Sequence, residues 1–370
     1  MLQPAAASPV SILDIQSNIY SNVGMRWDAQ ALERGDSPAA VSAASPTAAL
    51  LPLAGLVRTV STPEFAGITF HEVTAKSVLN KVVAGSRMPF DWTINPYRGC
   101  VHACVYCFAR PTHTYLDMNA GRDFETKVVV KVNAPEVLRR ELAAKRWKGE
   151  HIAMGTNTDP YQRIEGRYQL MRGIIRALAD HRNPFSILTK GTLITRDVDL
   201  LVEAAEHAEV SAAFSIGTLD EDVWRSTEPG TPSPRARIEA LRTLVDAGIP
   251  TGVLMAPILP GISDRPEQMR AVVEAALDAG ASHVSPIMLH LRPGVREEFW
   301  PWLEQEHPEL VERYADLYRK PYGPKAERDS LSSQVHRIID RTPRRRDALA
   351  PRFRRSRRPQ QQKAEQLTMW

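Results

Sequence analysis

Cysteine is scarce in this chain, whose 370 residues include three, at positions 100, 104 and 107. An odd, closely spaced set argues against a disulfide framework and fits a reducing compartment and a metal site better. Hydrophobic runs of about 18 residues are also missing, so no transmembrane helix is predicted. The N-terminal segment lacks the charged-then-apolar pattern of a secretory signal. We therefore expect a cytoplasmic protein.

Charge is unevenly spread along the chain. Its formal net charge is +4, yet the segment from Arg341 to Arg358 contains nine arginines and one aspartate. The rest of the chain is therefore mildly acidic. Such a basic tail is able to contact polyanions such as DNA or RNA. The alternative is a plain disordered tail with no partner.

Composition and periodicity divide the chain into five parts. The first part is rich in Ala, Ser and Pro without sustained periodicity, which predicts disorder. We expect a largely disordered N-terminal extension at 1–60, a lead-in segment at 61–90, a core at 91–320, a C-terminal helical segment at 321–340, and a basic disordered tail at 341–370 that ends in a short hydrophobic peptide.

Alternating strand and helix patterns fill the core. Strands are expected at 92–95, 151–155, 185–189, 210–216, 251–258 and 283–291. Helices are expected at 133–146, 168–181, 196–207, 233–247, 265–279 and 296–318. Six successive βα units predict an α/β fold with a parallel sheet curled into a partial (β/α)6 TIM-like barrel. Such sheets carry their chemistry at the carboxyl ends of the strands, where the polar clusters of this sequence also lie.

The three cysteines stand in the segment NPYRGCVHACVYC, residues 95–107, with the spacing C-x3-C-x2-C. Three thiolates on one tight loop can bind three irons of a [4Fe–4S] cubane. The fourth iron would remain open to a substrate or cofactor, because the chain has no fourth cysteine. Two alternatives remain: a zinc site completed by His102 or His113, and buried thiols without a metal.

With its aromatic residue before the last cysteine, this motif resembles the signature of radical S-adenosylmethionine (SAM) enzymes. Residues of about 70–320 are similar to the branch that contains spore photoproduct lyase. The shared segments are NPYRGCVHACVYCFAR, GTNTDPYQRIEGRY, ILTKGTLITRD, EPGTPSPRARIEAL and VLMAPILPGISD. The resemblance implies a radical SAM core, a [4Fe–4S] cluster on Cys100, Cys104 and Cys107, and SAM on the open iron. It also implies reductive cleavage of SAM to a 5′-deoxyadenosyl radical, which abstracts a hydrogen atom from the substrate.

Contacts to SAM are implied by the same resemblance. The residues concerned are Tyr106, Gly155, Thr156, Asn157, Thr158, Lys190 and Ser215. Residues 155–158 would meet the methionine amino group, Ser215 the ribose, and Tyr106 the adenine through its backbone. The Gly-Gly-Glu common in the wider superfamily is absent here, so the similarity is to the lyase-like branch alone. Alternatively, these residues are structural, with Asp159 capping a turn that Pro160 begins.

Two further features concern the substrate. The loop 228–232 (EPGTP) faces the substrate cavity in this family, but it also has the pattern of a plain turn before a helix. We therefore assign no catalytic role to Glu228. Spore photoproduct lyase uses a further cysteine as hydrogen donor, which this chain lacks. Tyr97, Tyr161 and Tyr168 are alternative donors, and the sequence selects none of them.

The last five residues, Gln366–Trp370, resemble the C-terminal peptide with which bacterial DNA-repair proteins bind the sliding clamp. Together with the basic tail, they favour DNA repair or nucleic-acid modification. The alternatives are a radical SAM enzyme that acts on a peptide or small metabolite, and a non-catalytic zinc- or cluster-binding protein that binds nucleic acid. An electron donor such as flavodoxin or ferredoxin is an expected partner, and a membrane is not.

Overall fold

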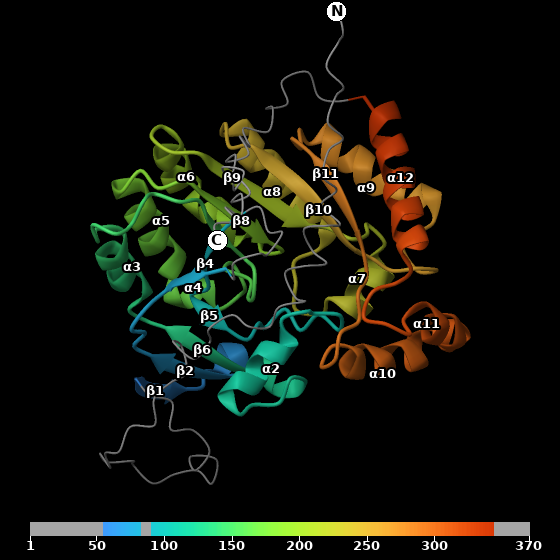
Figure 1. The fold of residues 1–370 in the computed structure, drawn as a ribbon, viewed down its shortest axis with the longest axis horizontal. Helices are drawn as coiled ribbons and strands as arrows, with labels where there is room; N and C mark the ends of the chain where they lie inside the picture. Colours follow the sequence, from blue (N-terminus) through green and yellow to red (C-terminus); the bar gives the residue numbers. More distant parts are fainter. Residues whose placement is uncertain (1–54, 83–89, 344–370) are drawn as a thin grey trace, which may run out of the picture.

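Six parallel strands form the main sheet of the computed structural model, which describes residues 55–82 and 90–343 (Figure 1). Their order is β11-β10-β9-β8-β7-β4, and the short β3 (Leu79–Lys81) pairs with β4 in the antiparallel sense. The parallel strands are β4 (Trp92–Ile94), β7 (Ile152–Met154), β8 (Phe185–Thr189), β9 (Val210–Ser215), β10 (Thr251–Ile258) and β11 (Val284–Met288). Each lies within a range expected from the sequence, so the predicted partial (β/α)6 barrel is confirmed.

Helices alternate with the strands along the chain. They are α2 (Arg122–Thr126), α3 (Ala134–Leu142), α4 (Glu165–Tyr168), α5 (Leu170–Asp180), α6 (Val198–Ala205), α7 (Glu221–Thr227), α8 (Pro234–Asp246), α9 (Pro266–Asp278), α10 (Arg296–Glu306), α11 (Val311–Leu317) and α12 (Lys325–Arg341). Four short 3-10 helices join them: η2 (Pro63–Phe65), η3 (Arg110–Leu116), η4 (Thr192–Asp197) and η5 (Pro308–Leu310). None of the described helices is long and apolar enough to cross a membrane.

One predicted helix, 296–318, is wrong as a single element. It divides into α10, η5 and α11, and His307 between the first two has φ −142° and ψ 57°, outside the helical region. Pro308 follows at once and has no N–H to continue the helical hydrogen bonds. Its ring also disfavours helical geometry at the residue before it.

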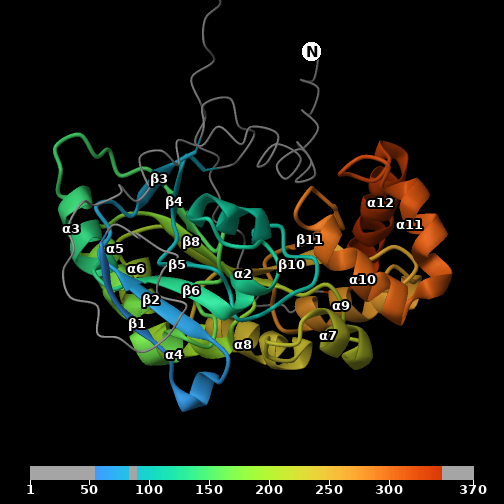
Figure 2. The ribbon, with the colours of Figure 1, turned by 90° about the horizontal axis from the view of Figure 1, so that it is seen from below.

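A second sheet of four strands was not predicted. Its order is β1 (Leu56–Val60), β2 (Thr69–Val73), β6 (Lys127–Lys131) and β5 (Tyr97–Arg98), with β2 and β6 parallel. Strand β1 corrects the expectation of disorder at the end of segment 1–60, whose first 54 residues lie outside the described part. Figures 1 and 2 both place this sheet on one side of the main sheet and α9 to α12 on the other.

Burial alternates along β8 and along most of β9. In β8, Phe185, Ile187 and Thr189 are buried and Ser186 and Leu188 are partly buried, and all but Phe185 line a cavity inside the curved sheet. The inward-facing residues of β9 line the same cavity. Because small residues occupy many of these inward positions, the lumen is hollow at the level of the site.

Residues 344–370, with most of the basic tail and the peptide Gln366–Trp370, lie outside the described residues.

Candidate functional site

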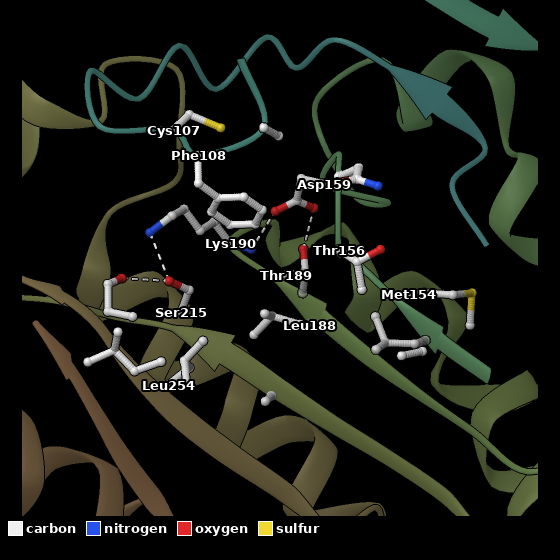
Figure 3. Close-up of a pocket in the computed structure, with 18 of the residues that line it drawn as sticks. Cys107, Phe108, Met154, Thr156, Asp159, Leu188, Thr189, Lys190, Ser215 and Leu254 are labelled. Carbon is white, nitrogen blue, oxygen red and sulfur yellow. Dashed lines mark hydrogen bonds between the residues drawn. The ribbon is translucent and has the colours of Figure 1, made fainter. Parts of the chain in front are cut away.

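A cavity of about 340 Å³ opens between the cysteine loop and the inner face of the main sheet (Figure 3). Its walls include every residue that the sequence analysis assigned to a cluster or to SAM. These residues are Cys100, Cys104, Cys107, Tyr106, Gly155, Thr156, Asn157, Thr158, Lys190 and Ser215. Segments nearly 120 residues apart in the chain are thus brought together at one place.

The cysteine loop begins at Gly99, between β5 and η3, and packs tightly against its surroundings. Gly99 has φ +84°, and a Cβ there would lie 2.7 Å from the carbonyl oxygen of Phe124. The next amide, that of Cys100, donates to the same oxygen at 2.9 Å. Glycine is therefore required at this position by both the backbone conformation and the close approach. The loop carries two buried cysteines, Cys100 and Cys104, and a half-buried Cys107.

A clamp from the turn after β7 holds the same loop. The hydroxyl of Thr158 donates to the carbonyl oxygen of Gly99 at 2.8 Å. The side-chain Nε2 atom of Gln162 donates to that carbonyl oxygen and to the Thr158 hydroxyl. The Gln162 Oε1 atom accepts the N–H of Val101 at 2.9 Å. Gln162 is fully buried. The segment GTNTDPYQ of the sequence therefore positions the cysteine loop as well as lining the cavity.

Burial is the largest influence on all three thiols. It raises the pKa of Cys107 and raises the pKa values of Cys100 and Cys104 further still. Thiols in such surroundings are protonated at neutral pH, and metal binding would release their protons, because thiolates are the ligands. These thiols are therefore unlike reactive, exposed cysteines, whose pKa values are lowered.

Thiolates ligate both iron–sulfur clusters and zinc ions. In residues 55–82 and 90–343, no three His, Cys, Asp or Glu side chains converge on a point where one metal ion would bind. A cubane does not need such a point, because each thiolate ligates a different iron. His113 does not line the cavity, and its Nε2 lies 2.8 Å from the carbonyl oxygen of Lys127. His102 does line the cavity.

Gly155 allows the backbones of β7 and β8 to approach each other closely. Its φ is +87°, and a Cβ would lie 1.9 Å from the carbonyl oxygen of Leu188. The next two residues, Thr156 and Asn157, are fixed by Asn95, whose Oδ1 lies 3.4 Å from the Thr156 hydroxyl and 3.1 Å from the Asn157 amide nitrogen. The carboxyl end of β7 is thus tied to the segment that leads into the cysteine loop.

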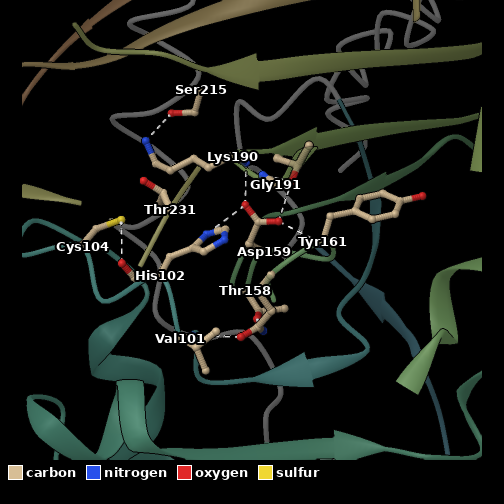
Figure 4. A network of polar contacts seen from close by, with 12 residues as sticks. Val101, His102, Cys104, Thr158, Asp159, Tyr161, Lys190, Gly191, Ser215 and Thr231 are labelled. Atoms are coloured by element: carbon tan, nitrogen blue, oxygen red, sulfur yellow. Dashed lines mark hydrogen bonds and ion pairs between the residues drawn. The ribbon is translucent and has the colours of Figure 1, made fainter. Parts of the chain in front are cut away.

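Asp159 connects three segments of the site (Figure 4). Its carboxylate accepts from the Tyr161 amide at 2.9 Å, from the Thr189 hydroxyl at 2.5 Å and from the Lys190 amide at 2.6 Å, and it lies 3.4 Å from His102 Nδ1. Burial alone would raise the pKa of Asp159, but His102 and these donors lower it. The capping role that the sequence suggested for Asp159 is present, and the contacts to His102 and Lys190 were missed.

Lys190 extends from the end of β8 into a buried polar network. Its Nζ donates to Ser215 Oγ at 3.0 Å, to Glu228 Oε1 at 2.8 Å and to the Tyr106 hydroxyl at 3.3 Å. The Ser215 hydroxyl donates to the carbonyl oxygen of Ala256 (Figure 3). Lys190 thus contacts two other residues assigned to SAM. Glu228, which contacts Lys190 and Tyr106, was left without a role by the sequence.

The three tyrosines named as hydrogen donors do not line the cavity. Each hydroxyl donates to a carboxylate elsewhere: Tyr97 to Glu165, Tyr161 to Asp197 at 3.0 Å, and Tyr168 to Glu72 at 3.0 Å. The Tyr161–Asp197 pair joins the motifs GTNTDPYQRIEGRY and ILTKGTLITRD, and the other two pairs join the first motif to β5 and β2. Among the described tyrosines, Tyr106 is the one that lines the cavity.

Comparison with known proteins finds relatives that match more than half of this chain. The chain is 49% identical to an uncharacterised protein of Mycobacterium tuberculosis over 85% of this chain and 92% of that protein. It is 31% identical to an uncharacterised protein of Methanocaldococcus jannaschii over 66% of this chain and 86% of that one. It is also 25% identical to a radical SAM Nalpha-GlyT isomerase of Pseudomonas phage M6, over 60% of this chain and 45% of that protein.

The fold is similar to that of solved spore photoproduct lyases. A lyase complexed with dinucleoside spore photoproduct superimposes with a TM-score of 0.54 at 18% identity, covering 74% of this chain and 79% of the lyase. A mutant lyase with bound AdoMet and the same dinucleoside gives 0.52 at 19% identity, covering 69% and 75%. The family model of the radical SAM superfamily matches residues 94–276, which contain the cysteine loop, β7 to β10 and most of α9. The chain belongs to the radical SAM superfamily.

Proposed function

We propose that this chain holds a [4Fe–4S] cluster on Cys100, Cys104 and Cys107 and cleaves SAM reductively in the adjoining cavity. The observation that carries the proposal is the position of all three thiols in the wall of the cavity that Lys190 and Ser215 also line. When bound, the cluster supplies the electron that converts SAM into methionine and a 5′-deoxyadenosyl radical. A flavodoxin or ferredoxin is the proposed source of that electron.

The chain's own residues would bind SAM and exclude water. Lys190 provides a positive charge for an anionic group, and Gly155 permits close approach of the ligand to the backbone. Leu188, Leu254 and Phe108 line the cavity with apolar surface. An apolar wall that excludes water strengthens nearby electrostatic interactions and protects a reactive radical from solvent.

We propose a nucleic acid as the substrate. The support is the basic segment Arg341–Arg358 together with the similar fold of lyases solved with a dinucleoside spore photoproduct. Every cysteine of the chain is assigned to the cluster, so the hydrogen donor differs from the cysteine of the lyase. The reaction is therefore proposed as repair or modification in a general sense, not as the lyase reaction.

Metal analysis of anaerobically prepared protein tests the proposed cluster. We expect about four irons and four sulfides per chain after reconstitution, and their loss in Cys104→Ala. His113→Gln serves as the matched control, because glutamine can still donate to the Lys127 carbonyl oxygen. The control retains the cluster under this proposal. Zinc in the wild-type protein, lost in Cys104→Ala, would instead support a Cys3His site that His102 completes.

Removal of residues 344–370 tests the proposed partners while leaving α12 complete. Counterion release makes binding through an arginine-rich segment steeply dependent on salt. We expect the truncated protein to bind DNA more weakly, with a smaller salt dependence, and to lose binding to the purified sliding clamp. A variant that lacks only Gln366–Trp370 should lose the clamp and keep DNA. Equal binding by all three proteins contradicts the proposal.

A further inference from the structure

Glu228 is a buried carboxylate whose contacts reach three separate segments of the site. It lies in the loop between α7 and α8, and 4% of its surface is exposed. The sequence places this loop firmly, because Ser233 caps α8 by accepting the Ala236 amide, and Pro234 occupies the first helical position. Glu228 therefore sits on a short, fixed connection between two helices.

Each carboxylate oxygen of Glu228 has partners of its own. Oε1 accepts from the Lys190 ammonium at 2.8 Å and from the Tyr106 hydroxyl. Oε2 accepts from the Arg237 guanidinium and lies 3.3 Å from the Thr231 hydroxyl. Tyr106 belongs to the cysteine loop, Lys190 to the end of β8, and Arg237 to α8. One carboxylate thus joins two segments that line the cavity to α8.

Backbone contacts dock the same loop onto the cysteine loop. The Gly230 amide donates to the carbonyl oxygen of His102 at 3.1 Å, and the Val105 amide donates to that of Thr227 at 3.0 Å. A Cβ at Gly230 would lie 2.1 Å from the carbonyl oxygen of Val101, so a larger residue would separate the two loops. The position of Glu228 is therefore coupled to that of the cysteine loop.

The charges of the network make the carboxylate necessary. Arg237 is fully buried and Lys190 largely so, and Glu228 is the anion between them. Burial would raise the pKa of Glu228, but Arg237 and Lys190 hold it well below its usual range. Without that charge, two buried cations would repel each other across a site of low dielectric.

The ammonium of Lys190 is held in a single direction. An ammonium has three N–H donors, and the three acceptors Glu228, Ser215 and Tyr106 surround this one. A flexible lysine side chain would otherwise occupy many rotamers. The acceptors fix where the positive charge faces the cavity before any ligand enters.

We infer that Glu228 is a positioning residue that holds the Lys190 ammonium and the Tyr106 ring in the geometry that SAM requires beside the cysteine loop. This inference rests on the proposed function, and it assigns no direct contact between Glu228 and SAM. Loss of the carboxylate lets repulsion from Arg237 push Lys190 out of the cavity wall. We therefore expect weaker binding of SAM and an unchanged content of the cluster.

Spectroscopy of anaerobically reconstituted protein tests the inference. Glu228→Gln should keep the iron and sulfide content of the wild type, while its dissociation constant for SAM rises by about tenfold or more. The change that SAM causes in the electron paramagnetic resonance (EPR) spectrum of the reduced cluster should shrink. Glu228→Asp keeps the charge on a shorter side chain and should recover part of both properties, even if Glu228→Gln folds poorly.

Glu72→Gln is the matched control. Glu72 is also a buried carboxylate that accepts from an arginine and a tyrosine, Arg58 and Tyr168, but neither of these partners lines the cavity, whereas Lys190 and Tyr106 do. The control should bind SAM as the wild type does. If Glu228→Gln has the SAM affinity and EPR response of the wild type, the inference is wrong and the proposed function still stands. A wild-type protein whose EPR spectrum does not respond to SAM overturns the proposed function and the inference with it.

Discussion

The side-chain amide of Gln162 holds the backbone of Val101, one residue after the first cysteine of the motif. Its Oε1 atom accepts the Val101 N–H at 2.9 Å, and its Nε2 atom donates to the carbonyl oxygen of Gly99 at 3.2 Å. Both partners belong to the cysteine loop, whereas Gln162 belongs to the turn after β7. The turn that lines the cavity is therefore attached to the loop that carries the thiols.

Gln162→Leu should weaken the attachment of the cysteine loop to the turn after β7. The leucine leaves the buried Val101 N–H without an acceptor, which costs about 1–3 kcal/mol of unfolding free energy. Denaturant unfolding of the metal-free protein measures that loss, and iron retained after gel filtration reports on the loop. The exposed Gln305→Leu should change neither quantity. Equal stability and iron retention in the two variants would show that the clamp is unimportant.

Gly155→Ala should do more harm than Gly149→Ala. Both glycines have positive φ, +87° and +71°, so alanine is strained at either, by about 1–2 kcal/mol of unfolding free energy. The added Cβ meets the Leu188 carbonyl oxygen at 1.9 Å only at position 155, while nothing lies within 4 Å at position 149.

The difference between the two variants therefore isolates the close approach of β7 and β8. We expect a lower unfolding free energy and weaker SAM binding in Gly155→Ala, and wild-type SAM binding in Gly149→Ala. Isothermal titration with SAM and denaturant unfolding supply both values. Identical behaviour of the two alanine variants would mean that the strand approach does not shape the cavity.

Lys131, at the end of β6, should make the unfolding free energy of the protein change with pH above pH 7. Burial lowers its pKa to about 7, helped by Arg98 and opposed by Glu141. The unfolded chain keeps the lysine protonated up to its ordinary pKa, so between pH 7 and that value the unfolded state binds more protons. Unfolding free energy should therefore rise with pH in this window, by up to about 1.4 kcal/mol per pH unit.

Lys131→Met removes the titrating group while keeping most of the apolar volume. We expect a higher unfolding free energy than the wild type at pH 7 and a flatter dependence between pH 7 and 9. Denaturant unfolding at several pH values gives both curves, and the difference between them cancels the other titrating groups. Parallel curves for the two proteins would show that Lys131 does not lose its proton on folding.

The sequence was sufficient for the main sheet and for the cysteine loop. The strands 185–189 and 251–258 were predicted to the residue, because each is a short β-branched run bounded by turn residues. The small sheet was missed, because its strands of two to five residues pair across distances that no local pattern records. Its central strand, Lys127–Lys131, ends in charged residues on both sides and resembles an exposed segment.

The ion-pair network of the site was also beyond local patterns. Glu228 stands in a Pro- and Gly-rich stretch that has the form of an ordinary turn, and its partners lie 38 and 122 residues away. Spacing along the chain cannot reveal such contacts. The helix break at Pro308, in contrast, was visible in the sequence, since proline rarely continues a helix.

Detection of 5′-deoxyadenosine tests most directly the claim that the three thiols hold a cluster which cleaves SAM. The protein is reconstituted without oxygen, reduced with dithionite and incubated with SAM, and the products are separated by chromatography. The account predicts 5′-deoxyadenosine and methionine in equal amounts from the wild-type protein, and neither from Cys104→Ala. A colourless wild-type protein that contains zinc and releases no 5′-deoxyadenosine would contradict it.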